Sequence, residues 1–171
     1  MADHELRGER LRLRHVTEAD LGALVAILQE PAVARWWGRY DADRARREML
    51  EDPQVEAFVI ELDGEVAGVL YVSEENEPDY RHAGLDISLA TAHQGHGYGR
   101  EALRVAIDHL VRERGHHRFT IDPAADNEVA IRSYAAVGFK PVGVLRRYER
   151  APDGTWRDGL LMDLLADELP S

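Results

Sequence analysis

A glycine-rich turn carries the most distinctive chemistry in the sequence. In Gln94-Gly95-His96-Gly97-Tyr98-Gly99, three glycines alternate directly between an apolar run and a stretch with helical periodicity. Glycines at such a junction let backbone N–H groups converge on an anion at the helix N-terminus, where the helix dipole also favours negative charge. The turn therefore predicts a bound phosphate or pyrophosphate, while the glycine spacing alone is equally compatible with a flexible connector.

Two common nucleotide-binding loops do not fit this turn. The Rossmann pattern needs one more residue before its third glycine, and the Walker loop needs Gly-Lys followed by Ser or Thr. Neither spacing is present in residues 94–99. The turn indicates a phosphate site of a different kind.

The elements that position the turn follow from hydrophobic periodicity and turn residues. Thr17 fits a helix N-cap, Asp63-Gly64 predicts a hairpin, and Gly115 and Gly138 fit helix C-caps. The expected order is one strand, two helices, three strands, a helix, a strand, a helix and two strands. The expected ranges are a helix from 17, a short aromatic segment 33–38, a helix 41–50, strands 58–62 and 66–72, a polar loop 74–82, a strand 84–89, a helix after 99, a strand 117–121, a helix 127–137, and strands 142–150 and 155–164.

The length and composition fit a single α/β domain spanning residues 1–171. A chain of 171 residues can bury a core without disulfides or a structural metal. The absence of cysteine excludes disulfides, thiolate metal sites and a cysteine nucleophile, so we expect no metal. The first fifteen residues are dense in charge, and no apolar run reaches the length of a membrane helix. We therefore expect a cytoplasmic protein with no membrane partner.

The net charge argues against one further class of partner. The chain carries 21 basic and 32 acidic side chains, a formal net charge of −11 at pH 7. Such a balance opposes binding to phosphate backbones, so nucleic acid is not an expected partner. A negative field does attract cationic ligands, although many acidic proteins carry their charge only for solubility.

Two motifs together resemble the GCN5-related N-acetyltransferase (GNAT) superfamily. Gln94, Gly97 and Gly99 match its signature Gln/Arg-x-x-Gly-x-Gly/Ala, and residues 127–139 are similar to its second motif, Asn-x-x-Ala-x-x-x-Tyr-x-x-x-Gly-Phe. The separation of the motifs and the order of elements also match, so the resemblance covers essentially the whole chain. It implies a mixed, mostly antiparallel sheet with helices on both faces and strands splayed at the acetyl-CoA site.

The resemblance implies that the chain takes acetyl-CoA as co-substrate. In such proteins the amides of the turn hold the pyrophosphate of coenzyme A, the residue matching Asn127 binds the pantetheine arm, and backbone N–H groups near Leu89 polarise the thioester carbonyl. His96 stands where the family often has arginine or lysine, which makes a charge contact to phosphate weaker or pH-dependent. The implied coenzyme-binding residues are Leu89, Gln94, Gly95, His96, Gly97, Tyr98, Gly99, Arg100, Asn127 and Tyr134.

Tyr134 is the candidate general acid that the resemblance supplies. Its match in the second motif places it near the coenzyme sulfur. A free thiol has a pKa of about 8–9, so a positioned phenol can protonate the departing thiolate. The alternative is a helix tyrosine that only packs in the core.

Several segments resemble aminoglycoside 6'-N-acetyltransferases, namely residues 35–38, the acidic loop leading to 84–86, and 120–127. The resemblance implies a small polycationic amine as acceptor, held by carboxylates. Asp86 is the first candidate for the base that deprotonates it and Asp122 the second, although each also fits a purely structural role. The candidate acceptor-binding residues are Trp36, Trp37, Glu75, Asp79, Asp86 and Asp122.

Other acceptors and other functions stay open from the sequence. Residues 144–165 also resemble the tail of ribosomal-protein N-acetyltransferases, which acetylate protein N-termini. Another small amine or a hydroxyamino acid is a further alternative. A non-catalytic acyl-CoA sensor would be expected to lack the tyrosine, and Tyr134 argues against it. Both a monomer and a homodimer are compatible with the sequence.

Overall fold

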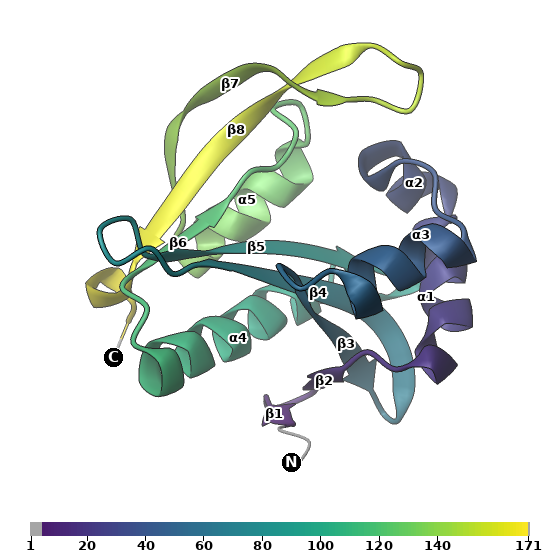
Figure 1. The fold of residues 1–171 in the computed structure, drawn as a ribbon, viewed down its shortest axis with the longest axis horizontal. Coiled ribbons are helices and arrows are strands. Elements are labelled where there is room, and N and C mark those ends of the chain that lie inside the picture. The colour runs from purple at the N-terminus through teal and green to yellow at the C-terminus, as the bar shows by residue number, and fades with distance from the viewer. Residues whose placement is uncertain (1–4, 171) are drawn as a thin grey trace.

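The computed structural model describes residues 5–170, which form a mixed α/β fold (Figure 1). The strands are β1 Leu6–Arg7, β2 Arg12–His15, β3 Glu56–Leu62, β4 Glu65–Glu75, β5 His82–Leu89, β6 Arg118–Ile121, β7 Lys140–Arg150 and β8 Trp156–Leu165. The α-helices are α1 Leu21–Leu28, α2 Pro31–Trp37, α3 Ala42–Arg46, α4 Tyr98–Arg114 and α5 Glu128–Val137. None of the helices within residues 5–170 is long and apolar enough to cross a membrane.

The strands form one sheet with the order β1-β2-β3-β4-β5-β6-β8-β7. Neighbouring strands of this sheet are antiparallel, apart from β5 and β6, which are parallel. β5 and β6 pair only at Ala83↔Phe119 and Gly84↔Thr120. Beyond Gly84 they separate. β6 pairs with β8, and β7 and β8 form a long hairpin that rises away from the rest of the sheet (Figure 1).

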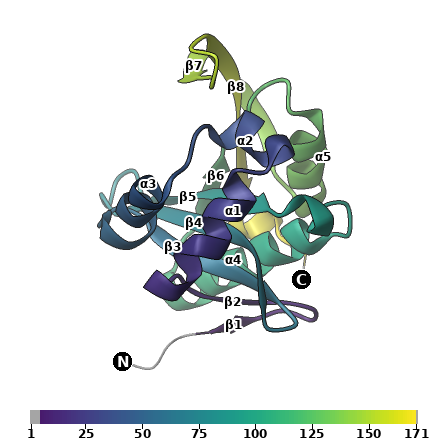
Figure 2. The ribbon, with the colours of Figure 1, turned by 90° about the vertical axis from the view of Figure 1, so that its right-hand side faces the viewer.

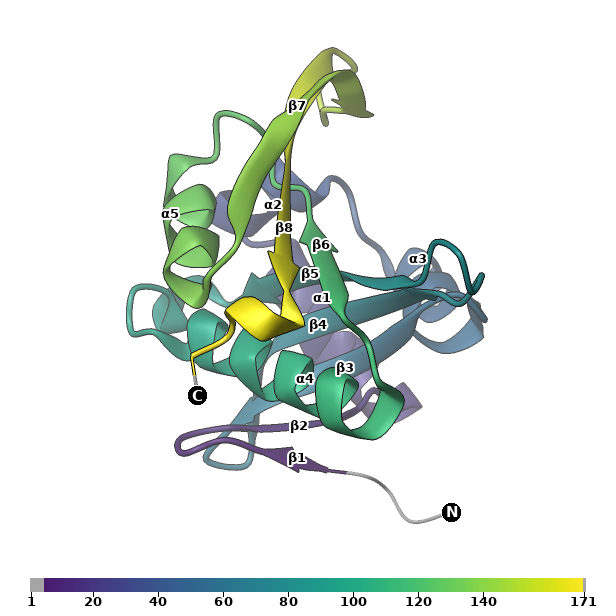
Figure 3. The same ribbon diagram turned by 90° about the vertical axis from the view of Figure 1, so that its left-hand side faces the viewer.

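Helices cover both faces of the sheet, as the sequence predicts. One core packs α4 and α5 against the sheet, with Phe58 and Ile60 of β3 among its buried residues. The other packs α1 to α3 against the opposite face, with Ala57 and Val59 of the same strand. This alternation arises because successive side chains of a strand point to opposite faces. Figures 2 and 3 show the arrangement from either side.

Several element boundaries differ from those expected. The aromatic segment 33–38 lies largely within α2, which begins with Pro31, a residue suited to the first helical turn. The helix expected over 41–50 is α3 followed by a π-helical turn, Arg47–Glu51. β4 continues to Glu75, so the polar loop before β5 is shorter than predicted. The two-residue strand β1 was not predicted.

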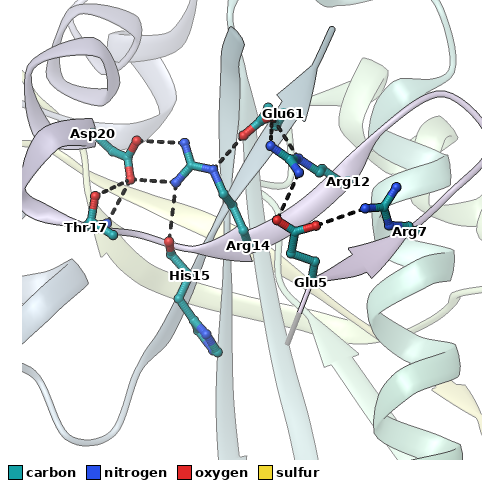
Figure 4. Close-up of polar contacts among 8 residues, drawn as sticks. All are labelled: Glu5, Arg7, Arg12, Arg14, His15, Thr17, Asp20 and Glu61. Carbon is teal, nitrogen blue, oxygen red and sulfur yellow. Dashed lines mark hydrogen bonds and ion pairs between the residues drawn. The ribbon is translucent and has the colours of Figure 1, made fainter. Parts of the chain in front are cut away.

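A buried ionic cluster joins β2, β3 and the turn before α1 (Figure 4). Glu61 is 4% exposed and accepts hydrogen bonds from Arg12 at 2.8 Å and from Arg14. Arg14 also donates two hydrogen bonds of 2.8 Å to Asp20, whose carboxylate accepts from the Thr17 N–H. Burial alone would raise the pKa of Glu61, but the hydrogen bonds from the two arginines outweigh it and lower that pKa.

Replacing Glu61 should therefore destabilise the fold. Glu61→Gln leaves two arginines beside a neutral amide in a largely dry site, so we expect a loss of about 2 to 4 kcal/mol in the free energy of unfolding. The measurement is urea unfolding near pH 7. Glu18→Gln is the matched control, because the Glu18–Arg46 pair is exposed and should change stability by about 0.5 kcal/mol or less. Equal effects of the two substitutions would contradict the prediction.

Candidate active site

A cavity of about 1180 Å³ opens where β5 and β6 diverge. Its walls are the end of β5, the glycine turn with the start of α4, the first part of α5, and, across from these, α2 with the tip of the β7–β8 hairpin. Sites for small molecules usually measure about 300–1,000 Å³. The cavity is therefore large enough to hold two ligands side by side.

The glycine turn lies at one end of this cavity. Gly95 and Gly97 have φ values of 81° and 82°, a left-handed conformation that residues with a Cβ rarely adopt. Gly97 precedes the first residue of α4, so the N-terminal amides of a 17-residue helix begin at the cavity wall. Gln94 Nε2 donates to the Leu89 carbonyl at 3.0 Å and ties the turn to the end of β5. The arrangement fits an anion held by backbone N–H groups.

Asp86 and Asp122 lie near the point of divergence. Gly84 pairs with Thr120 in the parallel register; Asp86 lies two residues further along β5, and Asp122 is the residue that follows the end of β6. Both line the cavity. The Asp86 carboxylate accepts from the N–H of Ile87 at 3.0 Å.

The surroundings of Asp86 raise its pKa to about 7, first through burial and then through repulsion by Asp122. Its side chain is exposed by accessible area, because the cavity admits water to it, while protein atoms enclose it on the remaining sides. The pKa of Asp122 is also raised by burial, although a hydrogen bond from Tyr148 opposes the shift. Near neutral pH Asp86 can thus both take up and release a proton.

Tyr134 of α5 is 9% exposed and lines the same cavity. Its ring packs against Phe139, with the ring centroids 6.5 Å apart. Burial, and then the nearby Asp86 and Asp122, raise its pKa above that of a free tyrosine. The phenol therefore stays protonated at neutral pH and can donate a proton.

Three residues of the β7–β8 hairpin complete the site and were not predicted. Tyr148 donates a hydrogen bond of 2.5 Å to Asp122, and this contact, followed by burial, raises the Tyr148 pKa to about 12. Arg157 pairs with Glu149 and donates to the carbonyl oxygens of Arg35 and Trp36, at 2.8 and 2.6 Å. Arg157 thereby joins the hairpin to α2 across the cavity.

The two tryptophans lie on the α2 side of the cavity. Trp36 is half-buried, with the guanidinium groups of Arg35 and Arg157 at 4.5 and 5.5 Å from its ring centroid. Trp37 also lines the cavity and packs edge-on against Tyr71, 5.4 Å between centroids. Both tryptophans line the cavity, and Trp37 also packs against the core.

Two expected acceptor residues lie elsewhere. Glu75 ends β4 and Asp79 lies in the following loop, and neither lines the cavity. The reason is the direction of β5, which begins beside this loop at His82 and reaches the cavity only at Asp86. The structure therefore does not form the anionic rim expected from residues 74–79.

The remaining expected coenzyme residues fall into two groups. Leu89, Gln94, Gly95, Gly97, Tyr98, Gly99, Arg100 and Asn127 all line the cavity. Asn127 also caps α5, since its side-chain oxygen accepts from the Ala130 N–H at 3.3 Å. His96 is exposed and does not line the cavity, so the expected contact of its ring with phosphate has no support in this geometry. His93 lines the cavity and was not predicted.

Comparison with known proteins defines the class of protein. A family profile described as an acetyltransferase (GNAT) domain matches residues 10–140. The fold and the site agree with this match, and the chain belongs to the GNAT acetyltransferase family. Members of this family use acetyl-CoA, so the chain is an acyltransferase with that co-substrate.

Three individual proteins show how far the likeness extends. Aminoglycoside N(6')-acetyltransferase type 1 from Klebsiella pneumoniae is 29% identical over 166 residues, covering 85% of this chain and 80% of that protein. Spermidine N(1)-acetyltransferase from Escherichia coli is 27% identical over 158 residues, covering 89% and 84%. The structure of Mycobacterium smegmatis RimJ in complex with CoA-disulfide superposes with a TM-score of 0.81 at 28% identity, covering 99% of this chain and 89% of RimJ.

The raised pKa of Asp86 predicts how stability depends on pH. Between about pH 4 and 7 the folded chain keeps a proton on Asp86 that the unfolded chain releases, so this group makes stability fall as pH rises through that window. Asp86→Asn cannot ionise. We expect its Tm to exceed the parent's by about 2–4 °C at pH 8 and to match it near pH 4, measured by calorimetry.

Asp79→Asn, in the exposed loop, is the control and should follow the parent at both pH values. A lower Tm for Asp86→Asn at pH 8 would show that the Asp86 carboxylate stabilises the fold.

Proposed function

We propose that this chain acetylates an amine of a small polycationic acceptor, with the 6'-amine of an aminoglycoside as the best candidate. The observation that carries the proposal is the pair Asp86 and Asp122, which both line the cavity where β5 and β6 diverge and whose charges repel each other. Two adjacent carboxylates with raised pKa values repel each other, and a ligand with several ammonium groups relieves that repulsion through charge-assisted hydrogen bonds. The aminoglycoside and spermidine relatives both act on amines of this kind, which supports the proposal.

The residues fit acetyl-CoA as the partner ligand. The two left-handed glycines before α4 bring N–H groups to the cavity wall, and a Cβ at Gly95 would meet open space, which suits a pyrophosphate. Acetyl-CoA, when bound, supplies the thioester that the amine attacks. In the proposed site Gly95, Gly97 and Tyr98 donate to the pyrophosphate, and Asn127 binds the pantetheine arm through its amide NH2 group.

Asp86 and Tyr134 carry the proton transfers in this proposal. An acceptor amine arrives mostly as ammonium, and an Asp86 oxygen takes one proton from it before the attack. A pKa of about 7 leaves a large share of Asp86 ionised at neutral pH. The C–N bond forms as the C–S bond breaks, Tyr134 Oη gives its proton to the departing sulfur, and the proton that the attacking nitrogen then loses restores the phenol, while N–H groups of β5 near Leu89 polarise the carbonyl. Asp122, oriented by Tyr148, holds a second ammonium group of the acceptor.

A protein N-terminus is the second candidate acceptor. The likeness to RimJ, over 99% of this chain at 28% identity, favours it. A peptide N-terminus carries one ammonium group and needs space for an extended chain, whereas an aminoglycoside carries several ammonium groups. The two candidates therefore differ in how strongly binding of the acceptor depends on the second carboxylate, Asp122.

The coenzyme site is tested by the thermal shift that coenzyme A produces. A ligand selective for the folded state raises Tm by mass action. Gly97→Val places a β-branched side chain at φ 82°, into the turn, and should abolish the shift. Gly64→Val, with φ 80° in the β3–β4 hairpin, introduces the same backbone strain away from the cavity and should keep the full shift. An unchanged shift in folded Gly97→Val would place the coenzyme elsewhere.

The general acid is tested by Tyr134→Phe. The ring still packs against Phe139, so we expect the Kd for coenzyme A to stay within about twofold, while kcat falls by about 10²-fold. Steady-state kinetics and calorimetric titration measure the two quantities. Tyr80→Phe, on a side chain 75% exposed, is the control. Parent-like turnover of Tyr134→Phe across the pH range would remove Tyr134 from the mechanism.

The acceptor is tested by salt dependence and by Asp122→Asn. The Debye length falls from about 30 Å at 0.01 M salt to about 8 Å at 0.15 M. We expect KM for a kanamycin-type acceptor to rise by about fivefold or more over this range, and KM for a monoamine by less than about twofold. Asp122→Asn should raise KM for the aminoglycoside, whereas Asp86→Asn should lower kcat.

Efficient acetylation of peptide N-termini without turnover of kanamycin-type or neomycin-type acceptors would overturn the aminoglycoside proposal and favour the second candidate.

A further inference from the structure

Arg10 contacts the glycine turn from outside the cavity. It lies in the connection between β1 and β2 and is not one of the residues that line the cavity. Its Nη1 donates to the carbonyl oxygen of His96 at 2.9 Å, and its guanidinium lies 4.5 Å from the ring centroid of Tyr98. Arg10 therefore contacts both the His96 carbonyl and the Tyr98 ring at the end of the turn.

Glu101 fixes the position of Arg10. Its carboxylate accepts from the backbone N–H of Arg10 at 2.9 Å and from Arg10 Nε at 3.1 Å. Glu101 lies in the first turn of α4, and its side chain is only 15% exposed. The guanidinium is thus attached to the helix that follows the turn as well as to the turn itself.

The direction of one peptide group follows from this contact. In a trans peptide the C=O and the next N–H point in opposite directions. Because Arg10 holds the His96 carbonyl outside the cavity, the N–H of Gly97 points the other way, and Gly97 lines the cavity. Gly95 and Gly97 flank this peptide, and glycines allow it to rotate more freely than other residues do.

We propose that Arg10 is a positioning residue for coenzyme binding. Together with Glu101 it orients the His96–Gly97 peptide so that its N–H is directed at the pyrophosphate before the coenzyme arrives. The inference rests on the proposed pyrophosphate site in the turn. The simpler alternative is attraction between the Arg10 charge and the phosphates, but Glu101 pairs with that charge at 3.1 Å and offsets most of it.

The test compares the binding of coenzyme A to single variants by calorimetric titration. Arg10→Met should raise the Kd for coenzyme A by about tenfold, and by the same factor for dephospho-coenzyme A, which keeps the pyrophosphate. Arg7→Met removes a charge from the same N-terminal hairpin at a side chain 76% exposed, and its Kd should stay within about twofold of the parent's. Circular dichroism and Tm establish that each variant is folded.

Glu101→Gln separates positioning from charge, because the two explanations predict opposite signs. Loss of the carboxylate removes negative charge near the phosphates. If Arg10 acted only through its charge, this variant would therefore bind coenzyme A more tightly than the parent. Positioning predicts that Glu101→Gln raises the Kd by about threefold or more, and that the Arg10→Met/Glu101→Gln double variant binds no more weakly than Arg10→Met.

Arg10→Lys keeps the charge without the forked geometry and should resemble Arg10→Met. The inference would be overturned if Arg10→Lys restored full binding or if Glu101→Gln bound coenzyme A more tightly. It would also be overturned by a parent-like Kd in Arg10→Met, or by a loss of affinity in that variant for coenzyme A but not for dephospho-coenzyme A. Failure of the pyrophosphate site itself is seen separately, as parent-like binding of coenzyme A by folded Gly97→Val.

Discussion

The site depends on the loss of hydrogen bonding between β5 and β6 beyond Gly84. Where two parallel strands part, their backbone groups no longer satisfy one another and must find partners in solvent, side chains or ligands. The same separation opens the cavity, which both Asp86 and Asp122 line. A fully paired sheet would have left no such opening between the two strands.

Two carboxylates of this chain respond oppositely to their surroundings. Glu61 is nearly inaccessible, yet its pKa is lowered, because Arg12 and Arg14 donate to it. Asp86 can be reached by water, yet its pKa is raised to about 7, first because protein atoms desolvate it and then because its charged neighbour is another carboxylate. The first arrangement stabilises the fold, whereas the second favours the uptake of a cation. Charge partners rather than burial alone decide which role a carboxylate has.

The sequence predicted the parts of the site whose signals are local. The glycine turn, Tyr134, Asp86 within its strand and Asp122 at the end of the next strand are each recognisable within a few residues, and the structure brings them to one cavity. The prediction placed Glu75 and Asp79 at the acceptor site, but acidic composition does not indicate which part of the fold a segment faces. They lie near the start of β5, whereas β5 reaches the cavity only further along.

Contacts between distant segments had no local signal. Arg10 lies 86 residues before the His96 carbonyl that it holds, and no periodicity indicates such a pair. Tyr148 follows a residue with φ 47°, in a region where the pairing of β7 and β8 is irregular. Such a shift in register changes which side chains face the cavity, so hydrophobic alternation could not place Tyr148 beside Asp122.

The bridge from Arg157 to α2 has a consequence for the order in which the molecule loses structure. Arg157 joins carbonyl groups 122 and 121 residues earlier in the chain, so the α2 side of the cavity is closed by segments from opposite ends of the sequence. Contacts with such long loop closures form only after most of the chain is in place. The hairpin tip is exposed, a feature typical of regions that open before the rest unfolds. On heating, acceptor binding should therefore disappear at a lower temperature than the sheet itself.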